Sequence, residues 1–153
     1  MIKYYWMNQV AGHKIVTLMD QDEMAALGAS LRQIDQKLLT PAQEEGTTRI
    51  WYQGGEPYFD LFVERREGEI KWFQLTLRGR SISWNRQVSG WQTGITNELQ
   101  ADDITFYPAS KLIESDRQPD SAFIELTHAI LRTRAGEEIF DQILALFDAH
   151  EKT

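Results

Sequence analysis

The chain has 153 residues, a hydrophobic fraction of 42%, a charged fraction of 25% and a formal net charge of -7 at pH 7. This length and composition predict that residues 1–153 form a single globular α+β domain that buries its own core. The acidic charge repels phosphate backbones and anionic lipid, so neither nucleic acid nor a membrane is an expected partner, and the lack of cysteine excludes disulfides, thiolate nucleophiles and cysteine-based metal centres.

The sequence contains no targeting or membrane-spanning signal. Its first residues lack a basic leader followed by an apolar run and a small-residue cleavage site. No apolar stretch approaches the length of about 20 residues that a membrane-spanning helix needs. We therefore expect a cytoplasmic protein.

The first forty residues predict a hairpin followed by a long helix. Residues 2–7 and 14–19 are short β-prone runs separated by a segment that contains a glycine. Asp20 is placed to cap a helix, and Glu23 is placed to complete the capping box. Apolar residues then follow at steps of three and four up to Thr40-Pro41, namely Met24, Leu27, Leu31, Ile34 and Leu38. This spacing predicts one amphipathic helix that ends before the proline.

Between residues 47 and 96 the hydrophobic period changes to two, which is typical of strands. The loop Arg66-Glu67-Gly68 predicts a three-residue hairpin connection that sets Leu61 opposite Phe73. A type II′ turn with Gly79 at its first central position would set Leu77 opposite Ile82. The segment therefore predicts an antiparallel meander of about five to seven strands.

This register gives the predicted sheet two different faces. The first face is apolar and consists of Phe59, Leu61, Val63, Phe73, Leu75, Leu77, Ile82 and Trp84. The second face is mostly polar but also carries four large side chains, Tyr58, Phe62, Ile70 and Trp72, with Phe62 expected across from Trp72.

Two helices are expected to close the chain, one from Pro119-Asp120 and one after Gly136. The predicted fold class is therefore α+β, an antiparallel meander packed on one face by three amphipathic helices. One helix precedes the main strands and two follow them.

No residue pattern points to catalysis or to a cofactor. The histidines are far apart and show no metal spacing: His13, His128 and His150. Asp20, Asp22 and Glu23 fit a helix start better than a cation site. Gly54-Gly55 precedes a strand and not a helix that could hold a phosphate. We therefore expect no cofactor and no metal ion, and we assign no catalytic residue; an enzyme is less favoured than a binding protein.

Two groups of residues are candidates for binding a partner. Tyr58, Phe62 and Trp72 form an aromatic set of the kind that marks interfaces, and an element of the same chain could equally cover them. The second group combines positive charge with an indole and consists of Arg78, Arg80, Arg86 and Trp91. An alternative explanation is that these arginines lie at hairpin corners and strand edges and keep the sheet soluble.

The sequence thus favours a small acidic protein-binding module, an adaptor, regulator or inhibitor that uses the aromatic face. Two alternatives stay open. The first is a small-ligand-binding or enzymatic domain with an apolar pocket between the sheet and the long helix. The second is a structural homodimer paired through the sheet face, with a second copy of the chain as the partner.

Overall fold

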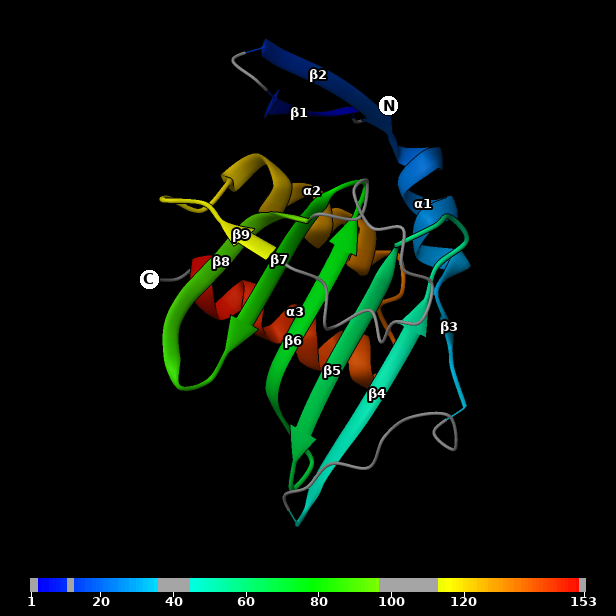
Figure 1. Ribbon diagram of the computed structural model, residues 1–153. Coiled ribbons are helices and arrows are strands. Elements are labelled where there is room, and N and C mark those ends of the chain that lie inside the picture. The colour runs from blue at the N-terminus through cyan, green and yellow to red at the C-terminus, as the bar shows by residue number, and fades with distance from the viewer. Residues whose placement is uncertain (1–2, 11–12, 36–44, 97–112, 152–153) are drawn as a thin grey trace. The chain divides into compact units, whose positions relative to one another are not determined.

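The computed structural model in Figure 1 describes residues 3–10, 13–35, 45–96 and 113–151. The predicted fold class is confirmed: an antiparallel meander sheet of seven strands, with one helix before these strands and two helices after them. The chain divides into two compact units, one made of Met1–Ala29 and Asp120–Thr153 and the other of Ser30–Pro119. That the whole chain forms one domain, and that the helices pack on one face of the sheet, stay predictions.

The first unit opens with the expected hairpin. Strands β1 (Lys3–Val10) and β2 (His13–Asp20) pair antiparallel over their full length, from Lys3 opposite Asp20 to Val10 opposite His13. Helix α1 (Gln21–Ser30) follows directly. The predicted cap is present, because the backbone N–H of Glu23 donates to Asp20 Oδ1 over 2.9 Å.

The predicted length of this helix was wrong. Helix α1 ends at Ser30, and Arg32–Gln33 form strand β3. The backbone N–H of Ile34 donates to the Trp51 carbonyl over 2.8 Å. Pairing with a neighbouring strand thus replaces the helix that the apolar spacing indicated, while Leu38 and Thr40-Pro41 lie outside the described residues.

The end of α1 packs closely against the end of helix α2 (Ser121–Arg132), and helix α3 (Glu138–Glu151) follows in the chain. A Cβ atom on Gly28 would lie 1.9 Å from Thr133 Oγ1 and 2.9 Å from the Ile130 carbonyl oxygen, so this contact requires glycine. Arg134 joins the three helices: its Nη1 donates to the Gly28 carbonyl over 2.9 Å, and its guanidinium lies 4.6 Å from the ring centre of Phe140.

The second unit is the sheet. Its strands are neighbours in chain order and all pairs are antiparallel (Figure 1). After β3 they are β4 (Thr47–Gln53), β5 (Asp60–Arg66), β6 (Glu69–Leu77), β7 (Arg80–Asn85), β8 (Val88–Thr96) and β9 (Ile113–Ser115).

The hairpin between β5 and β6 differs from the prediction. Its turn has two residues, Glu67 and Gly68, both with positive φ (52° and 83°), so that Arg66 pairs with Glu69. The pairing then shifts by one residue and leaves Lys71 as a β-bulge. Leu61 consequently lies opposite Leu75 and not opposite Phe73.

The turn between β6 and β7 was also predicted with the wrong register. Arg78 and Gly79 have φ values of 50° and 80°, the signature of a type I′ turn, and Leu77 pairs with Arg80 rather than with Ile82. Ile82 therefore lies opposite Leu75. The shift is two residues, so every side chain in β7 keeps the face that was predicted for it.

The predicted apolar face forms the core of the sheet. Most of its members are at most 1% exposed: Phe59, Leu61, Val63, Phe73, Leu75, Leu77 and Ile82. Trp84 is half-buried. Ile70 was predicted on the other face, but the bulge at Lys71 pairs it with Arg65 and brings it to this face, where it is 4% exposed.

The close approach at Gly28 predicts that Gly28→Ala destabilises the first unit by about 1–3 kcal/mol, because the added methyl overlaps Thr133. Helix propensity alone predicts the opposite sign, a gain of about 1 kcal/mol. Urea unfolding of the variant decides between them. Ala26→Ser, at an exposed position of the same helix, is the control and should change stability by less than about 1 kcal/mol. A Gly28→Ala chain as stable as the wild type would contradict the contact.

The contact of Arg134 with Glu137 predicts a pH-dependent contribution to stability. The hydrogen bond from Arg134 holds the pKa of Glu137 below its ordinary value of 4.5, desolvation opposes this effect, and the guanidinium charge adds to it. The contribution is therefore fully present above the unfolded pKa and is lost as the pH falls through the folded pKa.

The measurement is the free energy of unfolding of the wild type and of Glu137→Gln across the acidic range. We expect the difference between them to shrink as the pH falls. In an Arg134→Met background the same difference should be small at every pH, because the donor is gone. Equal pH profiles in both backgrounds would refute the role of Arg134.

Candidate functional site

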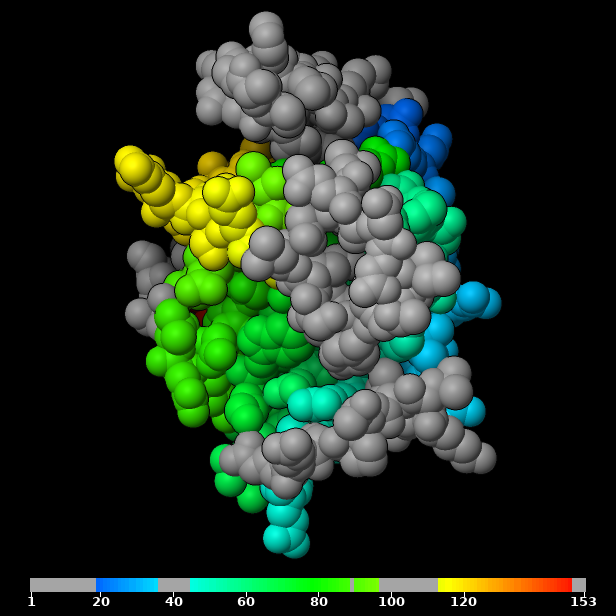
Figure 2. Space-filling view, viewed as in Figure 1, coloured from blue at the N-terminus to red at the C-terminus, as the bar shows by residue number. Residues whose placement is uncertain are grey.

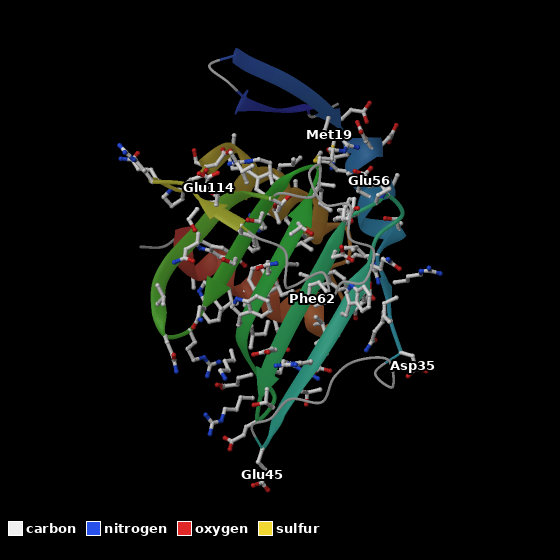
Figure 3. All side chains as sticks on the ribbon, in the orientation of Figure 1. Met19, Asp35, Glu45, Glu56, Phe62 and Glu114 are labelled. Carbon is white, nitrogen blue, oxygen red and sulfur yellow. The ribbon has the colours of Figure 1, made fainter. Side chains whose placement is uncertain are left out.

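The second face of the sheet carries the candidate site. The strand pairing places these residues on it: Arg49, Trp51, Gln53, Asp60, Phe62, Glu64, Trp72, Gln74, Thr76, Ser81, Ser83, Asn85 and Gln92. One labelled member, Phe62, is near the middle of the sheet in Figure 3. In Figure 2 the green strands β6 to β8 reach the surface of the visible side, with β9 in yellow beside them.

Gln74 is at the centre of the second face. Phe62 on β5 and Ser83 on β7 are its direct cross-strand partners. Trp72 and Thr76 are two residues away along β6 and therefore point to the same side. Asp60, which pairs with Thr76, is a diagonal neighbour, at a spacing of roughly 7–8 Å that a long side chain can bridge. Gln74 thus has aromatic neighbours on two sides and polar neighbours on the others.

The polar residues around this centre are buried. Their exposed fractions are 3% for Asp60, 6% for Gln74, 2% for Thr76 and 3% for Ser81. Buried polar groups are costly unless they are hydrogen-bonded, and two of these have visible partners. Trp51 Nε1 donates to Asp60 Oδ1 over 2.9 Å, and Thr76 Oγ1 donates to the Tyr58 carbonyl over 2.9 Å.

An aromatic stack and an ion pair flank the same centre. The rings of Trp51 and Phe62 are 5.4 Å apart and nearly parallel, at 16°. The indole of Trp51 is therefore fixed at both ends, by this stack and by its bond to Asp60. Beside Trp72, Arg49 Nε donates to Glu64 Oε1 over 3.0 Å, so these two opposite charges compensate each other.

The amide nitrogen of Gln74 differs from these groups. Its Nε2 is shielded from solvent and has no hydrogen-bond acceptor among the residues that the structure describes. A buried donor without an acceptor costs about 1–3 kcal/mol of stability. Such a group in a folded protein calls for an explanation, and a role in binding is one of them.

The predicted aromatic set is only partly brought together. Phe62 and Trp72 share the second face as expected, but Phe62 is opposite Gln74, and Trp72 is opposite Glu64. The predicted pairing of Phe62 with Trp72 was therefore wrong, because the bulge shifts the register. Tyr58 precedes β5, is half-buried and has a positive φ of 63°.

The three arginines do not form one cluster. Arg78 in the β6–β7 turn donates to Glu56 over 2.8 Å and 3.2 Å, whereas Arg86 follows the opposite end of β7 and donates to Glu69 over 2.9 Å. Arg80 is 9% exposed and donates to Asp116 over 2.8 Å.

Trp91 is buried on the first face, together with Arg80. It is 4% exposed and meets the ring of Phe73 edge-on, with 5.5 Å between the ring centres and an angle of 65°. Arg80 and Trp91 therefore do not share a face with Phe62 and Trp72. A role of these residues in binding stays a prediction.

Sequence reasoning missed Trp51, Asp60 and Gln74. A signal for Gln74 exists, since its amide is the one long polar side chain in the run Trp72-Phe73-Gln74-Leu75-Thr76-Leu77. The alternation in residues 47–53 also places Trp51 two positions from Arg49 on one face. Their closeness across strands depends on the register, which the sequence did not provide.

Within the described ranges, no three histidine, aspartate or glutamate side chains gather as metal ligands. In the same part of the chain, no helix has the length and apolar character needed to cross a membrane. No family model matches the chain, and neither a curated protein nor a solved structure similar to it was found.

The unpaired amide predicts that Gln74→Met stabilises the free protein by about 1–3 kcal/mol, because methionine keeps the length of the side chain and removes the buried donor. Urea unfolding measures the change. Gln92→Met, an exposed position on the same face, is the matched control and should change stability by less than about 0.5 kcal/mol. A loss of stability in Gln74→Met would mean that the amide is hydrogen-bonded.

Proposed function

We propose that this chain is a small, acidic, non-enzymatic protein-binding module, an adaptor, regulator or inhibitor that contacts its partner through the second face of the sheet. One observation carries the proposal: two half-buried indoles, Trp51 and Trp72, are on the same face at either side of the buried ring of Phe62. Tryptophan is enriched among residues that dominate binding energy, because it buries a large area with few rotatable bonds.

The surroundings of the indoles support this proposal. Ser83 and Asn85 are half-buried near Trp72, and Gln92 is exposed on strand β8. An aromatic centre with a polar margin is the usual composition of a protein interface. The margin can hydrogen-bond a partner, while the centre supplies the apolar area that leaves water.

The net charge of -7 supports a basic partner surface. Charge complementarity raises the rate of encounter, and added salt weakens this effect by screening. The indoles would then determine how long the complex lasts, because burial of large side chains acts mainly on the dissociation rate.

The proposal predicts that Trp72→Ala weakens the complex at least about tenfold, since truncation of a central interface tryptophan costs about 2 kcal/mol or more. Partners are captured from a lysate of the source organism on the wild-type chain and identified by mass spectrometry. The affinity of each purified partner is then measured by calorimetry for the wild type and the variants. Trp84→Ala is the matched control, because Trp84 is also half-buried but is on the first face.

The two variants separate binding from folding. Both remove a half-buried indole, so similar melting temperatures with different affinities would assign the effect to the second face. A partner that binds Trp72→Ala as tightly as the wild type contradicts the proposal. Association of the chain with itself that depends on Trp72 would instead identify a homodimer.

A further inference from the structure

We draw no further inference here: the strongest candidate, the half-buried indole of Trp72 on the second face of the sheet, with Glu64 and Asn85 opposite it on the neighbouring strands, belongs to the surface already proposed for binding, and nothing in the described part of the chain shows which chemical group covers it.

Discussion

The bulge at Lys71 is the constraint on which the arrangement of the sheet depends. A two-residue turn at Glu67 and Gly68 alone would place Asp60 opposite Leu75 and so mix polar and apolar side chains on both faces. The extra residue shifts the pairing by one, which returns Leu61 to Leu75 on the first face and Phe62 to Gln74 on the second. The core and the candidate site therefore have the same geometric origin.

The two faces of the sheet differ in the side chains that they bury. The first face is a tightly packed apolar core, in which Phe59, Phe73 and Leu75 are fully buried. The second face buries polar side chains as well, and the carboxylate of Asp60 accepts a hydrogen bond from the indole N–H of Trp51.

Local signals in the sequence predicted much of the fold. The cap at Asp20, the two closing helices and the alternation from residue 47 act over a few residues, and each is present. The predicted end of α1 was wrong, because the apolar spacing through Leu31 and Ile34 fits a helix. The backbone N–H of Ile34 instead donates to the carbonyl of Trp51, which is distant in sequence. The sequence did not predict the surroundings of Gln74 for a related reason. Its neighbours come from three strands, and the register of these strands depends on a bulge that no local pattern marks.

If the second face binds a partner as proposed, affinity and selectivity would have separate sources on it. The indoles of Trp51 and Trp72 offer apolar area, which attracts many kinds of ring but discriminates weakly, by roughly 10–200-fold for small changes of shape. The buried amide of Gln74 would contribute selectivity instead. A bound group without a hydrogen-bond acceptor would leave this amide unpaired and would therefore bind more weakly. The same donor that weakens the free protein would thereby make the proposed complex selective. On the proposed function, this combination would explain why a buried polar side chain lies beside Phe62 and Trp72.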